Sequence, residues 1–425
     1  MNSLALSLYN ALWTVAPRLL KRYLNRRARQ APAYLDHWPE RFGVPLPQPC
    51  QQPIWVHAVS VGETRAALPL IQALRAYYPE APLLLTQMTP TGRATAEQLY
   101  PDAQCRYLPY DKPAYVRQFI QEHRPLFGVI METELWPNLI HQAHAHGVPL
   151  CLANARLSER SLKGYLKVKA LIRPAVAKLD LVCAQSDADA ERLTALGAIR
   201  PVVCGSTKYD MPIPEAMHRL AHTFTARIGA RPVVICASTR YVNDAADEAA
   251  LLLQAWQAYA NKPNALLIMV PRHVERFHAV AESAQALGFK VQKRSDQQPI
   301  APDTQVWVGD SIGELFAYYL CADVAFVGGS LVDTGCQSII EPLICGLPTL
   351  FGPSTYNFAQ VSQDVLSANA AIQVSSAQAW QQAVADLLAQ PLVCQALSTR
   401  AHAFIKKNQG ASHKMATLIH ARHTA

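Results

Sequence analysis

The chain has 425 residues, of which 50% are hydrophobic and 16% are charged. This composition excludes a disordered or collagen-like protein, which needs high charge or periodic glycine. The length predicts about two or three domains. Lys and Arg number 39 and Asp and Glu 31, which gives a net charge of +8. Six cations precede the first acid, Asp36, so the excess belongs mainly to the N-terminal segment and not to a nucleic-acid-binding face: Arg18, Lys21, Arg22, Arg26, Arg27 and Arg29.

The N-terminal segment, residues 1–30, is predicted to form one helix, because leucines cover most of its surface and polar residues recur every three or four positions. Its uncharged part ends at Pro17, which is short for a bilayer span of about 20 residues. A secretory signal is not predicted, because the segment lacks a basic start and a small-residue cleavage site.

Three interpretations of this helix remain open. It lies in a membrane interface, it spans the membrane with its basic flank on the cytoplasmic side, or it packs on its own domain. We favour membrane association of residues 1–35, because the basic cluster needs an anionic partner.

From residue 54 onward, short apolar runs alternate with helix-like stretches. Continuous apolar strands separated by helices predict parallel sheets that are covered on both faces. Residues 206–220 contain prolines and no apolar run, so they are predicted to link two doubly wound α/β domains with a ligand cleft between them. The predicted strands are 54–59, 83–87, 126–131, 149–154, 181–185 and 201–205, then 231–238, 265–271, 291–293, 305–309, 323–329 and 348–352.

Acidic residues follow two strands of the first domain. Glu63 lies in the first turn of a helix after strand 54–59, where it either stabilises the helix start or acts as a general base. Glu132 and Glu134 follow strand 126–131 directly. They either cap the helix that begins near Trp136 or bind hydroxyl groups, and we favour binding because one cap does not need two acids.

Basic residues are also placed after strands. Arg93 and Arg156 follow strands of the first domain. Residues 156–178 contain seven cations and a single acid, Glu159. They form either an exposed basic helix or a surface for a phosphorylated, membrane-held substrate.

In the second domain, Ser238 and Arg272 lie at strand–helix junctions, where backbone N–H groups favour anions. Lys208 and Arg272 could neutralise a leaving phosphate. Ser338 and Glu341 match either a ribose-binding carboxylate site or an S-x-x-E capping box, and spacing alone favours the capping box.

Other signatures of known chemistry are missing from the sequence. It contains no Walker P-loop, no H-E-x-x-H and no G-x-S-x-G motif, and nothing in it requires a metal. The ten cysteines form no C-x-x-C pair, which predicts buried free thiols.

In this order, the motifs resemble the bacterial 3-deoxy-D-manno-octulosonate (Kdo) transferases of lipopolysaccharide synthesis. The resemblance runs over most of the chain and rests on HAVSVGET (57–64), METELWPN (131–138), GSTKYD (205–210), PRHVER (271–276), DSIGEL (310–315) and ADVAFVGGSL (322–331). It implies a GT-B glycosyltransferase with two Rossmann-like domains, of which the first, 36–212, binds the acceptor and the second, 213–400, binds the nucleotide sugar. A helix in 401–425 is expected to pack back on the first domain.

The resemblance also implies the reaction. Kdo passes from CMP-Kdo, a substrate, to a tetraacylated, bisphosphorylated lipid A precursor, with inversion and without a metal or other cofactor. The expected location is the cytoplasmic face of the bacterial inner membrane, with its anionic lipids as partners of the N-terminal helix. The sequence does not fix the number of Kdo residues transferred.

Family roles then fall on individual residues. Glu63 matches the general base, and the acceptor-side motifs carry Arg93, Glu132, Glu134 and Arg156. The CMP-side motifs carry Lys208, Ser238, Arg272, Ile312, Gly313, Ser338 and Glu341.

Two segments depart from the family pattern. Gly335-Cys336-Gln337-Ser338 stands where the family usually has G-G-H-N, and the loop after Thr239 lacks the usual G-E-E. Two rival interpretations are a GT-B transferase that uses a UDP-sugar and a non-catalytic, membrane-associated lipid-binding protein.

Overall fold

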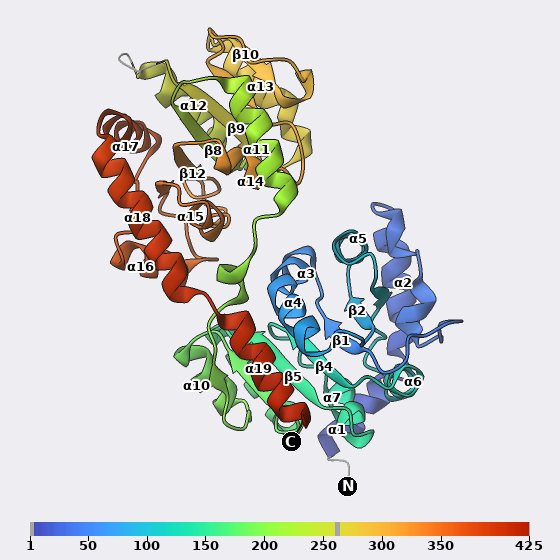
Figure 1. Ribbon diagram of the computed structural model, residues 1–425. Coiled ribbons are helices and arrows are strands. Elements are labelled where there is room, and N and C mark those ends of the chain that lie inside the picture. Colours follow the sequence, from blue (N-terminus) through green and yellow to red (C-terminus); the bar gives the residue numbers. More distant parts are fainter. Residues whose placement is uncertain (1–3, 260–263, 425) are drawn as a thin grey trace. The chain divides into compact units, whose positions relative to one another are not determined.

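The structure is a computed structural model that describes residues 4–259 and 264–424. It divides into two units, one ending at Met211 and resuming at Gln409, and the other running from Pro212 to Asn408. Each unit is built around one seven-stranded sheet in which all strands pair in parallel (Figure 1). The prediction of two doubly wound α/β domains is therefore confirmed.

The first sheet has the order β3-β2-β1-β4-β5-β6-β7. Its central strands are continuous apolar runs because both faces are covered by helices. One face packs against α6, α7 and α9, and the other against α4 and α19. The strands are β1 (Ile54–His57), β2 (Leu83–Gln87), β3 (Gln104–Tyr107), β4 (Phe127–Met131), β5 (Leu150–Ala155), β6 (Leu181–Ala184) and β7 (Val202–Val203). The α-helices are α1 (Leu4–Leu12), α2 (Ala16–Ala28), α3 (Val61–Ala66), α4 (Leu68–Tyr77), α5 (Pro90–Leu99), α6 (Pro113–His123), α7 (Pro137–Ala145), α8 (Glu159–Lys167), α9 (Lys169–Val176), α10 (Asp187–Ala195) and α19 (Ala411–Thr424), with 3₁₀ turns η1 (Pro32–Tyr34), η2 (Trp38–Phe42) and η3 (Thr207–Asp210).

The second sheet has the order β10-β11-β9-β8-β12-β13-β14. Helices α12, α13 and α17 cover one face, and α11 and α14 cover the other (Figure 1). The strands are β8 (Val233–Thr239), β9 (Leu266–Pro271), β10 (Val291–Lys293), β11 (Val306–Val308), β12 (Val324–Val327), β13 (Thr349–Phe351) and β14 (Ile372–Gln373). The α-helices are α11 (Glu215–Ile228), α12 (Glu248–Ala258), α13 (Phe277–Ala286), α14 (Leu315–Leu320), α15 (Ile340–Ile344), α16 (Ala359–Ser367), α17 (Ala377–Ala389) and α18 (Pro391–Asn408), with 3₁₀ turns η4 (Asp244–Ala246), η5 (Val274–Arg276) and η6 (Arg294–Asp296).

Two predicted elements differ from the structure, and two strands were not predicted. The N-terminal helix is two helices, α1 and α2, because Pro17 near the start of α2 lacks the N–H that a continuous helix would need. The predicted linker 206–220 is mostly ordered, since η3 ends at Asp210 and α11 begins at Glu215. The edge strands β3 and β14 were not predicted.

Two further findings concern the ends and the thiols. Residues 401–408 complete α18 of the second unit, and the last helix, α19, belongs to the first unit. All ten cysteines are free, and they are buried or half-buried.

Within the described ranges, no helix combines the length and apolarity that a membrane crossing requires.

Candidate functional site

Three carboxylates gather at the carboxyl edge of the first sheet. Glu63 stands in the first turn of α3, which follows β1, and Glu132 and Glu134 directly follow β4. Strands β1 and β4 are neighbours, with His57 paired to Ile130. The negative charges of Glu132 and Glu134 are close enough to raise the pKa of Glu63. The topology therefore brings together the three acids that the sequence singled out.

Glu63 takes part in the capping of α3, whose N-cap is Ser60. Its backbone N–H donates to Ser60 Oγ at 3.5 Å, and the Ser60 hydroxyl donates to Glu63 Oε1 at 3.1 Å. The Val59 N–H donates to Glu63 Oε2 at 2.8 Å. Burial, opposed by these bonds, raises the pKa of Glu63 to about 7. The helix-start interpretation is confirmed, and the raised pKa suits a base that works near neutral pH.

Glu132 and Glu134 do not cap the helix that follows them. Asp111 does so from a distant loop, because its carboxylate accepts from the Asn138 and Leu139 N–H groups at 2.9 and 2.8 Å. Glu134 Oε2 instead accepts from Trp136 Nε1 at 2.8 Å, and burial raises the pKa of Glu134. The capping alternative is therefore wrong for both acids, and sequence reasoning missed Asp111.

The Glu132 backbone is held in a costly conformation. Its φ of 56° lies in the left-handed region that non-glycine residues seldom adopt. Lys208 Nζ from η3 lies 3.7 Å from Glu132 Oε1. The resemblance placed Lys208 on the nucleotide side, whereas the structure pairs it with an acceptor-side acid, and its role toward the donor stays a prediction.

The two acceptor-side arginines differ in how they are engaged. Arg93 donates to Glu40 Oε2 at 2.7 Å, to Glu97 Oε1 at 2.8 Å and to the Cys105 carbonyl at 3.1 Å. Its side chain is only 11% exposed. Arg156 is exposed, and its carbonyl accepts from the Thr133 hydroxyl between the two acids. Arg156 is thus accessible to a ligand, whereas the Arg93 guanidinium is already bonded to neighbouring residues.

In the second unit, one buried acid fixes the loops at the carboxyl edge. Glu248, the first residue of α12, accepts from four backbone N–H groups, those of Arg240, Gly329, Ser330 and Leu331, at 2.6–3.0 Å. Sequence reasoning missed it, although an acid at a helix start was a usable signal.

The residues expected to hold the nucleotide lie around these loops. Ser238 has a φ of 57°, and its carbonyl approaches Gly328 so closely that a Cβ there would lie 2.6 Å away. Arg272 is exposed after β9, and its backbone N–H donates to the Thr239 carbonyl at 3.0 Å. Ile312 is 65% exposed beside Gly313, whose φ of 84° favours glycine.

Ser338 and Glu341 lie at the start of α15. The helix begins at Ile340 with Ile339 as its N-cap, so Ser338 is not the capping residue that the spacing predicted. Both side chains are half-buried. The ribose-binding alternative stays a prediction.

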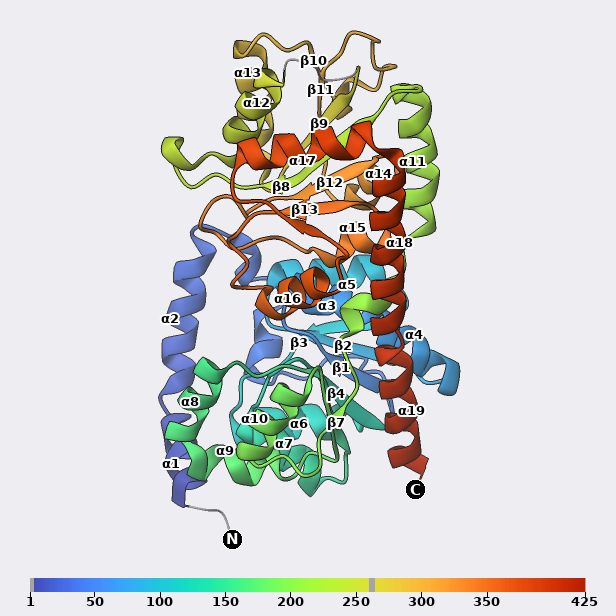
Figure 2. The same cartoon turned by 90° about the vertical axis from the view of Figure 1, so that its left-hand side faces the viewer.

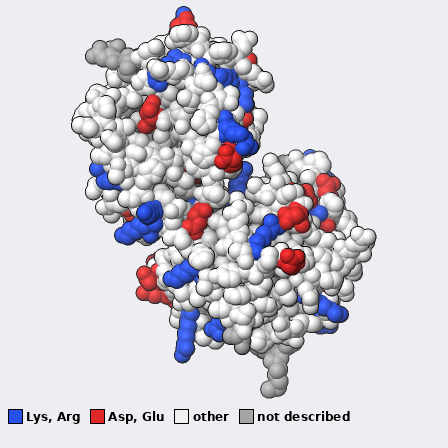
Figure 3. Space-filling model, in the orientation of Figure 1, with Lys and Arg blue, Asp and Glu red and all other residues white. Residues whose placement is uncertain are grey.

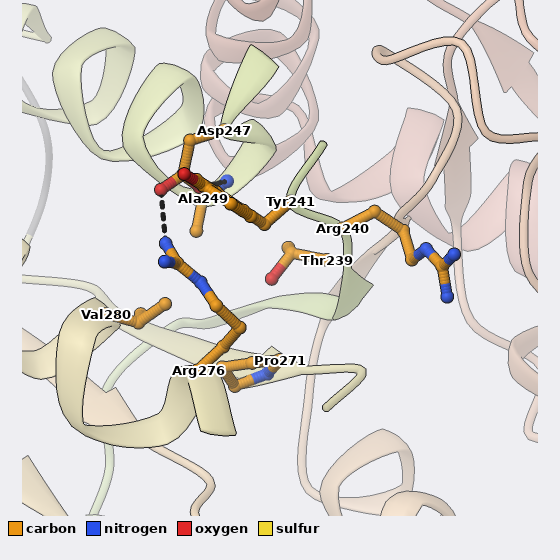
Figure 4. Close-up of a pocket in the computed structure, with 8 residues that line it drawn as sticks. All are labelled: Thr239, Arg240, Tyr241, Asp247, Ala249, Pro271, Arg276 and Val280. Atoms are coloured by element: carbon orange, nitrogen blue, oxygen red, sulfur yellow. Dashed lines mark hydrogen bonds and ion pairs between the residues drawn. The ribbon is translucent and has the colours of Figure 1, made fainter. Parts of the chain in front are cut away.

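The loop after Thr239, which departs from the family pattern, lines a small pocket together with Arg276. Arg276 Nη2 lies 2.5 Å from Asp247 Oδ2, and its guanidinium lies 4.0 Å over the Tyr241 ring (Figure 4). Arg240 points away from this pocket, and its Nη1 lies 2.8 Å from His273 Nε2. The changed loop is therefore bonded to the segment that follows β9, through Arg276 and His273.

Charge is dispersed on one face of the units. On the face drawn in Figure 3, acidic and basic side chains form small separate groups on a mainly uncharged surface of each unit. Within residues 4–259 and 264–424, no group of three or more His, Cys, Asp and Glu side chains is placed to hold a metal ion.

The N-terminal helices pack on their own unit through one face. Trp13 and Leu24 are buried against Tyr110, and the Tyr9 hydroxyl donates to Asp111 Oδ2 at 2.9 Å. The other face carries an exposed apolar row, in which each side chain is 53–77% exposed: Leu4, Leu8, Leu12, Val15 and Leu19. The helices therefore pack on their own unit, while membrane association stays a prediction, and the row is exposed in the described part of the first unit.

Comparisons with known proteins agree with this architecture. A family model described as 3-deoxy-D-manno-octulosonic-acid transferase (kdotransferase) matches residues 36–211. The chain is 41% identical to a 3-deoxy-D-manno-octulosonic acid transferase of Bordetella pertussis, over 95% of this chain and 96% of that one. It is 34% identical to a transferase of the same name from Haemophilus influenzae, over 97% of each chain.

Solved structures show a similar fold at low identity. The UDP-GlcNAc 2-epimerase of Neisseria meningitidis aligns with a TM-score of 0.60 and 13% identity, over 87% of this chain and 98% of that one. A glycosyltransferase from Rickettsia africae aligns with a TM-score of 0.55 and 11% identity, over 87% and 98% of the two chains. These two likenesses concern the fold alone.

Proposed function

The chain belongs to the 3-deoxy-D-manno-octulosonic acid transferase family, and from that premise we propose that it moves Kdo from CMP-Kdo to a tetraacylated, bisphosphorylated lipid A precursor. The observation that carries the proposal is the half-buried Glu63 carboxylate beside Glu132 and Glu134, with a pKa raised to about 7. Such a group holds and releases a proton near neutral pH, as transfer to a hydroxyl acceptor requires.

In the proposed reaction, Glu63 takes the proton of an acceptor hydroxyl. The hydroxyl oxygen forms a bond to the anomeric carbon of Kdo while the bond from that carbon to the CMP phosphate oxygen breaks, which inverts the anomeric centre. Negative charge develops on the leaving phosphate. Arg272, Lys208 and backbone N–H groups at helix starts supply positive charge for it.

The first unit offers cations for the acceptor phosphates. Six exposed cations lie on and beside α8 and α9: Arg156, Arg160, Lys163, Lys167, Lys169 and Arg173. Helix α1 packs against α9, so the exposed apolar row and these cations lie in one region of the unit (Figure 2). We propose that this region meets the cytoplasmic face of the inner membrane, with the row among acyl chains and the cations on anionic headgroups.

Transfer is tested by mass spectrometry. Purified protein is incubated with lipid A precursor and with CMP-Kdo made in situ, with and without a metal chelator. We expect mass gains in whole Kdo units that the chelator does not change, and the gains also count the residues added. No gain with active substrates would contradict the reaction and favour the non-catalytic rival, and inhibition by UDP rather than CMP would favour a UDP-sugar donor.

Membrane docking is tested by sedimentation with vesicles. The double variant Leu8→Ser/Leu12→Ser should lose most binding to vesicles that contain anionic lipid, whereas Leu392→Ser, at an 80% exposed leucine of α18, should bind as the wild type does. Equal binding of all three proteins would place the membrane contact elsewhere.

A further inference from the structure

The turn that carries Lys208 is held from several directions. The Thr207 N–H donates to Asn154 Oδ1 at 3.1 Å, and Ser206 Oγ accepts from the Lys208 N–H at 3.4 Å. The last residue of the turn, Asp210, makes its contacts with a segment 200 positions further along the chain. The position of Lys208 therefore depends on the end of the sequence.

Asp210 caps the last helix, α19. Its Oδ1 accepts from the Gly410 N–H at 2.6 Å, and its Oδ2 accepts from the Ser412 N–H at 2.7 Å. Gln409 Nε2 adds a bond to the Tyr209 carbonyl at 3.2 Å. A carboxylate at the N-terminus of a 14-residue helix also gains from the helix dipole. The turn and the helix start thus form one bonded unit.

Helix α19 is firmly fixed to the first sheet. Its apolar face is buried in the same core cluster as α4 and β1, through Ala411, Met415, Ala416 and Ile419. Lys414 Nζ donates to the Val203 carbonyl at 2.7 Å, next to the turn. A Cβ at Gly205 would lie 3.5 Å from the Ala411 side chain. The helix therefore supports the turn through backbone, side-chain and packing contacts.

We propose that α19 is a positioning element for the transfer reaction, and that Asp210 is the positioning residue through which it holds Lys208 against Glu132. This inference rests on the proposed function of Lys208 and Glu132. Asp210 and Lys208 belong to the same turn, η3, and Lys208 Nζ lies 3.7 Å from Glu132 Oε1. When the turn relaxes, Glu132 loses its cation beside Glu63, and the site carries uncompensated negative charge.

A double-mutant cycle separates positioning from simple stabilisation. We expect Asp210→Ala to lower kcat about tenfold in the wild-type background and less than twofold in a Lys208→Ala background, because both changes act on one group. Asp180→Asn is the matched control, since Asp180 Oδ2 also accepts a backbone N–H, that of Leu150 at 2.8 Å, at the opposite edge of the sheet. A full tenfold loss in both backgrounds would overturn the proposal.

A second readout does not need activity. Amide hydrogen exchange over residues 205–210 should become faster in Asp210→Ala and stay unchanged in Asp180→Asn. Thermal unfolding curves verify that both variants are folded. Unchanged exchange in Asp210→Ala would also overturn the proposal. If the wild type transfers no Kdo, the proposed function fails while this measurement still decides whether α19 holds the turn.

Discussion

The two sheets have closely related connectivity but opposite chemistry at their carboxyl edges. In each unit the first strand is central: β1 lies between β2 and β4, and β8 lies between β9 and β12. The edge of the first sheet gathers Glu63, Glu132 and Glu134, whereas the edge of the second carries Arg272 beside glycine-containing loops. The fold fixes where the strand ends meet, and the residues placed there decide what each edge can bind.

The same difference is visible between two glutamates in equivalent places. Glu63 and Glu248 each stand in the first turn of the helix that follows the first strand of its sheet. Glu63 accepts from one backbone N–H and one hydroxyl and stays half-buried. Glu248 is fully buried and accepts from four backbone N–H groups. Glu63 therefore keeps a partly exposed carboxylate, whereas the Glu248 carboxylate holds backbone loops together.

The sharpest test of this comparison is Glu63→Gln. We expect turnover to fall about 10²–10⁴-fold, because a positioned general base is lost while the amide can still accept from the Val59 N–H. Kdo transfer is followed by mass spectrometry, with Glu191→Gln on an exposed face of α10 as the control. Near-normal turnover in Glu63→Gln would show that the acidic edge does not supply the base.

The second test addresses the basic edge. Arg272→Ala should weaken CMP binding about 10–100-fold, since a charge-assisted hydrogen bond contributes about 1.5–3 kcal/mol. Calorimetry measures the affinity, and Arg219→Ala, on the surface of α11, should leave it unchanged. If Glu63→Gln weakens CMP binding as much as Arg272→Ala does, the division of roles between the units is wrong.

The third test concerns the structural glutamate. Glu248→Gln should lower the free energy of unfolding by about 1–3 kcal/mol, because the amide NH₂ group then faces backbone donors in a buried place. Denaturant titration gives the value. Glu63→Gln, at the exposed edge, should lower the free energy of unfolding much less. Equal losses in the two variants would contradict the structural difference between the two glutamates.

The smallest expected effect is in the pH dependence. Because the pKa of Glu63 is raised from 4.5 to about 7, kcat/KM should rise with pH through an apparent pKa near 7. The folded state holds this proton more tightly than the unfolded chain, so the stabilising contribution is full at low pH and is lost as pH rises through 7. Glu63→Gln should therefore lessen the fall in Tm between pH 5 and pH 8, and a fall equal to that of the wild type would contradict the raised pKa.

Much of the fold followed from the sequence because it depends on local pattern. Apolar runs separated by helices gave both sheets, and acids after strands gave Glu63, Glu132 and Glu134. The resemblance supplied the family. Glu63 illustrates the limit, because its place at a helix start is local, whereas its raised pKa depends on burial and, to a lesser extent, on the charges of Glu132 and Glu134.

The missed residues depend on contacts between distant segments. Asp111 bonds to Asn138, 27 positions away, Glu248 to Gly329, 81 positions away, and Asp210 to Gly410, 200 positions away. Glu248 carried a usable local signal, its place at a helix start, whereas no local pattern distinguishes Asp111 and Asp210 from exposed acids. The break between α1 and α2 was different, since Pro17 was visible and its effect on helix continuity could have been predicted.

The return of α19 to the first unit has a consequence for biosynthesis. The chain leaves that unit after Met211 and re-enters it only at Gln409, so nearly two hundred residues of the second unit are translated in between. Helix α19 covers part of the apolar face of the first sheet. This part stays uncovered until residues 411–424 emerge from the ribosome. The nascent first unit is thus incomplete until α19 has been synthesised, and a chain that terminates before residue 411 exposes apolar surface to chaperones and proteases.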